Sequence, residues 1–267
     1  MDERLRANRE NWDDRVGIHV LSEFYDVEGW LRDAPGPLER ERALIGDVRG
    51  KSLLQLQCHF GKETLQWARV GAVVTGVDFS PAAIEAAQKL AARAGLEDRS
   101  TFVCSNVYDA AQVLEGQEFD VVYVTLGSLG WLPDIRQWAK VVATMIAPGG
   151  QFYLFDVHPL AFCFDDEGAR VVYDYFEDSA NPLIFDDGTT YTDGSRVEHT
   201  RTYEWNHSLA EIVQSLIDEG LVIDTLLEHD WTVYQGFPWL EKDDEGIYQI
   251  PLGYPRLPLT FTLHARR

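Results

Sequence analysis

The chain has 267 residues, 45% of them hydrophobic, which suits one large α/β domain or two small ones and excludes wholesale disorder. Its 23 basic and 44 acidic residues give a formal net charge of -21, which argues against binding duplex nucleic acid or an anionic membrane surface. No apolar run approaches the roughly 20 residues that span a bilayer, and the first six residues contain no signal region, so we expect a cytoplasmic protein.

Short apolar and β-branched runs alternate with helical segments between residues 51 and 158. Strands are predicted at 51–57, 73–78, 101–104, 119–125 and 151–157. Helices are predicted at 62–70, 81–94 and 134–147, with Ser80 as the N-cap and Pro81 as the first residue of the second one. This alternation predicts a parallel sheet that is covered by helices on both faces.

The chain changes character after residue 158. Residues 159–206 are acidic, aromatic and rich in turn residues, which indicates an insertion rather than another strand–helix unit. Ser208 and Glu211 form a capping box at the start of a helix that ends at Gly220. Long strands are predicted at 221–233 and 257–265, and because no helix separates them we expect an antiparallel hairpin.

Two features at the ends of the first two strands predict a ligand site. In open α/β sheets, ligands lie beyond the carboxyl ends of the strands, where a following helix presents unpaired backbone N–H groups. Asp78 ends the second strand, where an acid accepts hydrogen bonds from ribose hydroxyls; its alternative role is to cap the next turn. Gly61 is the only glycine in the first turn, and the side chains of Gln57 and His59 would hinder the approach of a pyrophosphate. A nucleoside ligand without pyrophosphate fits better.

Three widely separated cysteines (Cys58, Cys104 and Cys163) suit neither a disulfide framework nor paired zinc ligands, so we predict no metal site.

The order of these elements, the strand-end acid, the Pro-Gly-Gly at 148–150 and the terminal hairpin resemble a class I S-adenosylmethionine-dependent methyltransferase. The run K-S-L-L-Q-L-Q-C-H-F-G-K is similar to a bacterial small-molecule subgroup, in which Gln-Cys-His-Phe-Gly replaces the usual glycine-rich turn. Residues 127–134, 158–159 and 203–209 also match it. The resemblance covers nearly the whole chain. It implies a Rossmann-like, mostly parallel seven-stranded sheet with helices on both faces and a C-terminal antiparallel hairpin.

The resemblance implies the following cofactor-binding residues: Gln55, Gln57, Cys58, His59, Gly61, Asp78, Phe79, Asn106, Val107, Thr125 and Leu126. Gln55 stands where the family has an acid, and residues 57–61 form the turn under the methionine part of S-adenosylmethionine. Asp78 would hold the ribose, while Phe79, Asn106 and Val107 would contact the adenine. Thr125 and Leu126 would line the methyl-transfer channel.

Methyl transfer needs alignment and exclusion of water more than a covalent nucleophile. A general base helps when the acceptor is protic, and His158, just past the fifth strand, is the candidate; its alternative role is to anchor the His-Pro turn. Trp12, His19, Tyr25 and Trp131 are predicted to belong to the substrate site and its lid. Tyr123 lies near an element that is expected at the same pocket mouth, and for each single aromatic residue core or lid packing is the favoured role over stabilising a cation. His207 is expected to be structural and His59 to orient the cofactor.

We therefore predict one domain: an N-terminal helical lid (1–50), a cofactor-binding core (51–158), an acidic aromatic insertion (159–206), and a C-terminal helix with its hairpin (207–267). The predicted function is methyl transfer to a small molecule, with no nucleic acid or membrane partner; the oligomeric state stays open. The alternatives are a non-catalytic or regulatory cofactor-binding protein on the same scaffold and a nicotinamide-dependent oxidoreductase. The acceptor atom, whether O, N, S or C, cannot be read from these landmarks.

Overall fold

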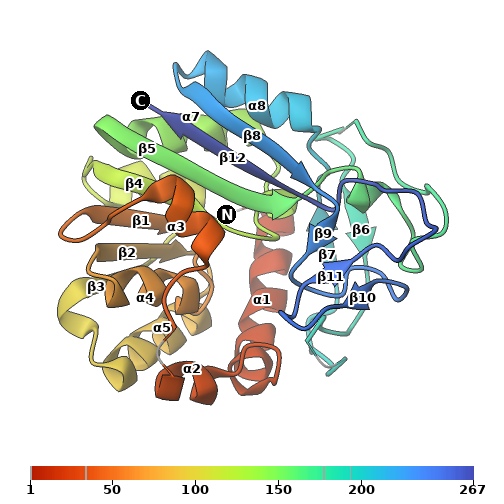
Figure 1. The fold of residues 1–267 in the computed structure, drawn as a ribbon, viewed down its shortest axis with the longest axis horizontal. Coiled ribbons are helices and arrows are strands. Elements are labelled where there is room, and N and C mark those ends of the chain that lie inside the picture. Colours follow the sequence, from red (N-terminus) through yellow and green to blue (C-terminus); the bar gives the residue numbers. More distant parts are fainter. Residues whose placement is uncertain (1, 34, 177, 193) are drawn as a thin grey trace.

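A computed structural model describes residues 2–33, 35–176, 178–192 and 194–267. Its centre is a seven-stranded sheet (Figure 1). In spatial order the strands are β3 (Ser100–Cys104), β2 (Val73–Asp78), β1 (Ser52–Leu56), β4 (Phe119–Val124), β5 (Ile146–Val157), β12 (Thr260–Arg266) and β8 (Val222–His229). β12 is antiparallel to both of its neighbours, and the first five strands are mutually parallel. The predicted fold class is confirmed.

Eight α-helices occur in the described part of the chain: α1 (Glu3–Leu21), α2 (Val27–Asp33), α3 (Glu39–Ile45), α4 (Lys62–Arg69), α5 (Pro81–Ala94), α6 (Ala110–Val113), α7 (Ile135–Met145) and α8 (Leu209–Asp218). The Ser80 hydroxyl accepts a hydrogen bond from Ala83 N at 3.0 Å, so the predicted N-cap of α5 is confirmed. None of the described helices is both long enough and apolar enough to cross a membrane.

The core lies on both faces of the sheet. On one face, Trp138 of α7 and Leu216 of α8 pack with Phe152 of β5 and Phe261 of β12, and all four side chains are fully buried. α3 and α4 cover the other face of β1, β4 and β5. Because fully burying one large apolar side chain contributes about 1.5–3 kcal/mol, these two layers hold the strand ends in place.

The structure differs from the sequence prediction in three local respects. α7 ends at Met145, and the Pro-Gly-Gly lies inside β5 at an irregularity of its pairing with β4. The predicted strand at 221–233 divides into β8 and β9 (Trp231–Thr232), because β9 leaves the main sheet. β9 joins β10 (Glu241–Lys242) and β11 (Tyr248–Gln249) in a small sheet within the connection of the terminal hairpin.

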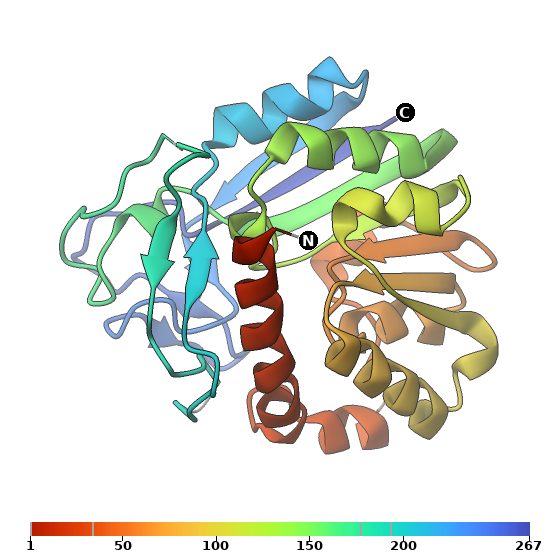
Figure 2. The ribbon, with the colours of Figure 1, turned by 180° about the vertical axis from the view of Figure 1, so that it is seen from behind.

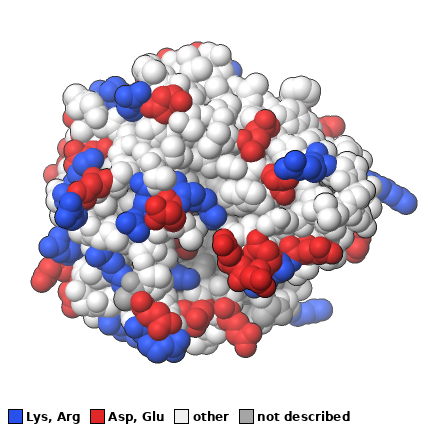
Figure 3. Space-filling model, viewed as in Figure 1, with Lys and Arg blue, Asp and Glu red and all other residues white. Residues whose placement is uncertain are grey.

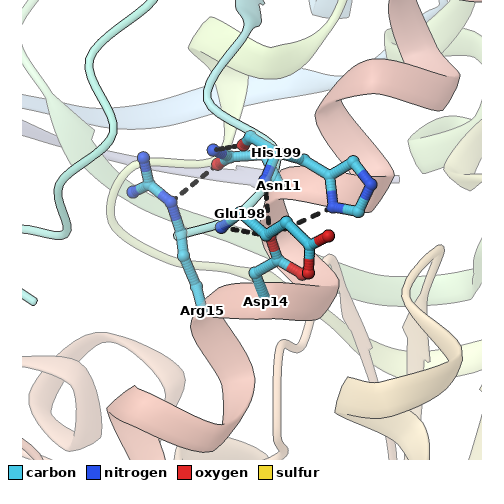
Figure 4. Close-up of polar contacts among 5 residues, drawn as sticks. All are labelled: Asn11, Asp14, Arg15, Glu198 and His199. Carbon is cyan, nitrogen blue, oxygen red and sulfur yellow. Dashed lines mark hydrogen bonds and ion pairs between the residues drawn. The ribbon is translucent and has the colours of Figure 1, made fainter. Parts of the chain in front are cut away.

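The insertion carries one antiparallel strand pair, β6 (Leu183–Phe185) and β7 (Thr202–Glu204). α1 stands between this pair and the main sheet (Figure 2). The Asn8 side chain donates to Tyr203 O at 2.7 Å and accepts from Tyr203 N at 2.8 Å, and Asn11 donates to His199 O at 2.7 Å. Asp14 accepts bonds from the N–H groups of Glu198 and His199 (Figure 4). Amide and carboxylate side chains of one helix face thus fix the insertion to α1.

Asn8→Ala removes both bonds to Tyr203 and leaves partly buried backbone polar groups without their partner. We expect it to lower the free energy of unfolding by about 1–3 kcal/mol, measured by chemical denaturation. Arg6→Ala, at an exposed position of the same helix, is the matched control and should change it by less than about 0.5 kcal/mol. Equal effects of the two substitutions would contradict the anchoring role of Asn8.

Candidate active site

A cavity of about 380 Å³ opens at the carboxyl ends of β1, β2 and β4, which is within the size range of small-molecule sites. Among the residues predicted from the sequence, its lining includes Trp12, Tyr25, Gln55, Gln57, Cys58, His59, Asp78, Phe79, Asn106, Val107, Thr125, Leu126 and Trp131. Four further residues that the sequence placed at or near the site, Gly61, His19, His158 and Tyr123, are not part of the lining. The fold therefore gathers most of the candidate side chains around one space.

The turn between β1 and α4 has an unusual backbone. Gln57 and His59 have φ of 57° and 51°, in the left-handed region that favours glycine, and Gly61 has φ of 74°. Gln57 is held by its amide, which donates to Ser128 O at 2.7 Å. The backbone N–H of His59 donates to Asp78 Oδ2 at 2.8 Å. Contacts to β2 and to the loop after β4 thus stabilise a conformation that glycine would adopt more readily.

Asp78 connects this turn with the start of α5. Its Oδ1 accepts a hydrogen bond from Ser80 N at 2.9 Å, while Oδ2 accepts the one from His59 N. Burial raises the pKa of Asp78 to about 6, against the lowering effect of these backbone hydrogen bonds. Each carboxylate oxygen can accept a further bond, so a carboxylate that lines the cavity still has capacity for a ligand.

A chain of side-chain contacts runs from the insertion to this turn. Thr190 Oγ1 lies 2.6 Å from His19 Nε2, and His19 Nδ1 lies 2.9 Å from His59 Nε2. Burial, reinforced by the neighbouring His19, lowers the pKa of His59 well below its usual value, which favours a neutral imidazole. The Trp12 ring meets the His59 ring edge-on, with centroids 5.2 Å apart. α1 therefore covers the cavity through Trp12, while His19 holds His59 in place.

The loop after β4 is fixed by Asp156, which the sequence analysis did not single out. Its carboxylate accepts bonds from the backbone N–H groups of Gly127 and Leu129, the latter at 3.0 Å. Burial raises the pKa of Asp156 to about 6. An acid within the apolar strand F-Y-L-F-D-V was the signal that could have identified it.

The lining residues that were also missed include Arg15, Tyr191, Glu204 and Tyr234. They come from α1, from the insertion and from the segment after β9. Glu204 lies in the matching segment 203–209, Y-E-W-N-H-S-L, where a carboxylate between aromatic residues was the available signal.

Two histidines outside the lining have structural positions. His158 Nδ1 accepts a bond from Leu160 N at 3.1 Å, and Nε2 lies 2.9 Å from the Glu228 carboxylate. Both ring nitrogens thus face protein groups, and this imidazole anchors the turn after β5 rather than facing the cavity. His207 Nε2 contacts Leu132 O at 2.7 Å.

Tyr123 has the packing role that the sequence favoured for a single aromatic residue. Its side chain is fully buried, and its hydroxyl donates to Glu41 at 2.9 Å within the core rather than at the mouth of the cavity. The alternating directions of side chains along β4 place it on the face that α3 covers.

Comparisons with known proteins agree with this geometry. Residues 53–150 match a family model described as a methyltransferase domain. A probable chloroplastic tocopherol O-methyltransferase of Oryza sativa subsp. japonica is 22% identical over 84% of this chain and 67% of its own length. A ubiquinone biosynthesis O-methyltransferase of Coxiella burnetii is 27% identical over 47% of this chain and 53% of its own. The chain thus spans between about half and two thirds of these two relatives.

Solved structures show the same fold at low sequence identity. The complex of DhpI with SAH has a TM-score of 0.57 and 19% identity, covering 98% of this chain and 96% of the other. An S-adenosylmethionine-dependent methyltransferase from Mesorhizobium loti has a TM-score of 0.55 and 18% identity, covering 90% and 100%. These comparisons favour neither a nicotinamide-dependent oxidoreductase nor a non-catalytic binding protein.

Gly61→Ala tests the packing of the turn. A Cβ atom there would lie 2.5 Å from the Phe102 ring and would also be strained by the positive φ. We expect the free energy of unfolding to fall by about 2–5 kcal/mol, the sum of both penalties. Gly95→Ala is the matched control, since Gly95 has φ of 67° but open space around it, and should cost only about 1–2 kcal/mol. Denaturant unfolding measures both, and equal losses would show that Phe102 does not restrict the turn.

Proposed function

We propose that this chain is a class I S-adenosylmethionine-dependent methyltransferase, whose cavity binds S-adenosylmethionine beside a small acceptor and promotes methyl transfer between them. The observation that carries the proposal is the Asp78 carboxylate, which lines the cavity at the end of β2 and is held by the cofactor turn itself. When bound, S-adenosylmethionine supplies an electrophilic methyl group on its sulfonium.

The residues present fit such a ligand. Gln57 Oε1 is buried at the cavity wall and has no hydrogen-bond partner among the residues that the structure describes. A buried unpaired acceptor is costly, and an ammonium group of the methionine part would satisfy it. Asp78 would accept bonds from the ribose hydroxyls. Phe79, Asn106 and Val107 line the cavity next to it and would surround the adenine.

The protein's own contribution would be alignment and exclusion of water. Trp12 of α1 and Trp131 of the short helix at Leu129–Trp131 have centroids 5.3 Å apart, edge to face, and both line the cavity. Gln55 donates to the Thr125 hydroxyl at 3.1 Å, which positions the end of β4 against the turn. The small-molecule acceptor would lie between these elements, toward the insertion.

Asp78→Asn tests the proposed ribose contact. We expect binding of S-adenosylhomocysteine, measured by calorimetry, to weaken at least tenfold, because the amide cannot accept the same pair of bonds and about 1–3 kcal/mol is lost. Asp120→Asn is the matched control, since Asp120 also accepts from a backbone N–H, that of Ser52 at 2.8 Å, but at the opposite end of the sheet. Absence of binding to folded wild-type protein would overturn the proposed function.

The raised pKa of Asp78 predicts a pH dependence. Ribose hydroxyls that donate to the carboxylate favour its ionised form, so binding lowers the pKa from about 6 and releases protons. The affinity for S-adenosylhomocysteine should therefore rise between about pH 5 and pH 6 and level off above pH 7. Calorimetric titrations across this range measure it. Asp78→Asn should remove this limb of the profile, and an unchanged limb would assign it to another group.

A further inference from the structure

One part of the cavity is formed without the strand ends that carry the cofactor residues. We call the following set the acceptor chamber: Arg15, Trp131, Phe162, Tyr191, Glu204 and Tyr234. Its polar groups are one carboxylate, one guanidinium and two phenols, set among aromatic rings. Most of these residues belong to the insertion or to α1, and none belongs to the turn between β1 and α4.

The backbone on both sides of Glu204 is anchored by hydrogen bonds. Glu204 ends β7, where it pairs with Leu183, and both of its chain neighbours are fixed. Tyr203 N donates to Asn8 at 2.8 Å, and Trp205 N donates to Gly130 O at 2.8 Å. An anchored backbone limits the positions that the Glu204 carboxylate can take, which reduces the entropy lost when a ligand binds.

The Glu204 carboxylate forms no ion pair with any residue that the structure describes. Burial raises its pKa to about 7, while the charge of Arg15 and a hydrogen bond with Thr202 act in the opposite direction. A carboxylate that is withdrawn from water and forms no ion pair is unfavourable, and a bound cation would relieve this penalty.

Arg15 occupies a separate place in the chamber. Its Nε donates to Asn11 at 2.7 Å (Figure 4), and its guanidinium lies 5.3 Å from the Trp12 ring centroid and 5.9 Å from that of Trp131. Arg15 is thus held by α1 and lies beside two tryptophan rings, and it forms no ion pair with Glu204.

The surroundings also favour a cation. Aromatic faces attract an ammonium group through the ring quadrupole, and Trp131, Tyr191 and Tyr234 supply such rings. The net charge of -21 raises the local concentration of cations around the protein. Acidic side chains gather beside a hollow on one face, over the region of β9–β11 (Figure 3), where Asp243, Asp244 and Glu245 are exposed. β9 leads directly into Tyr234 of the chamber.

We propose that Glu204 determines acceptor specificity by binding the ammonium group of a small amine that has an apolar or aromatic body. This inference rests on the proposed function, because it assumes that the strand-end part of the cavity holds the cofactor. It narrows the substrate to a compound that carries an ammonium group, and the atom that accepts the methyl group is a separate site on that compound.

Three probes with similar bodies and different head groups test the proposal: 2-phenylethylamine, 2-phenylethanol and 3-phenylpropionate. Calorimetry measures their binding to protein saturated with S-adenosylhomocysteine. The amine should bind at least tenfold more tightly than the alcohol, and the acid should bind most weakly. Glu204→Gln should abolish the advantage of the amine, and Glu204→Asp should retain part of it. Glu198→Gln, at an exposed acid of the same insertion, is the matched control and should change nothing.

Several outcomes would overturn the proposal. They are equal binding of the three probes, preference for the acid, no binding of any probe, and an amine preference that survives Glu204→Gln. Weaker binding of S-adenosylhomocysteine itself to Glu204→Gln would instead place Glu204 at the methionine end of the cofactor. Titration of the wild-type protein with S-adenosylhomocysteine alone keeps the two proposals distinguishable. If wild-type protein does not bind S-adenosylhomocysteine, the proposed function fails; if it does and the probes show no dependence on Glu204, only this inference fails.

Discussion

The buried carboxylate of Asp78 is the contact on which the functional end of the molecule depends. It ends β2, receives the backbone N–H of His59 from the turn after β1, and receives Ser80 N at the start of α5. Three consecutive pieces of the α/β unit therefore converge on one side chain. Because that side chain also lines the cavity, the group that shapes the turn is the one offered to the ribose, and occupation of the site is coupled to the local fold.

The second constraint is the polar face of α1. Asn8 and Asn11 are fully buried and bind the backbone of the insertion, while Asp13 on another face accepts a bond from Ser80 Oγ at 2.5 Å. One helix thus joins the insertion to the start of α5. The acceptor chamber takes its shape from this helix, so cofactor-binding and acceptor-binding parts share a rigid element although they lie far apart in the sequence.

The sequence predicted the main sheet because β-branched runs, the Ser80-Pro81 start and the glycine stops are local signals. It also identified the strand-end residues, since a parallel sheet brings those ends together. It missed Arg15 and Glu204 because their neighbourhood depends on tertiary contacts. The buried face of α1 includes Asn8, Asn11 and His19, so apolar periodicity does not mark it. Among the many carboxylates of the insertion, the aromatic neighbours of Glu204 were a weak signal that its side chain would face inward.

The departures from the usual glycine-rich turn have a common physical explanation. Gln55, in the place of an acid, accepts from the Thr64 hydroxyl at 2.5 Å and donates to Thr125, which a carboxylate could not do. The Gln57 side chain donates a hydrogen bond to Ser128 O, and His59 Nε2 lies within hydrogen-bond distance of His19 Nδ1. Each replacement therefore adds a bond from the turn to a different element. Those bonds offset the strain of a left-handed backbone at Gln57 and His59, where glycine would provide freedom but no cross-link. A turn that is fixed by side chains also brings polar groups of its own to the cavity wall, so its contribution to cofactor binding depends on these particular residues and not on the backbone alone.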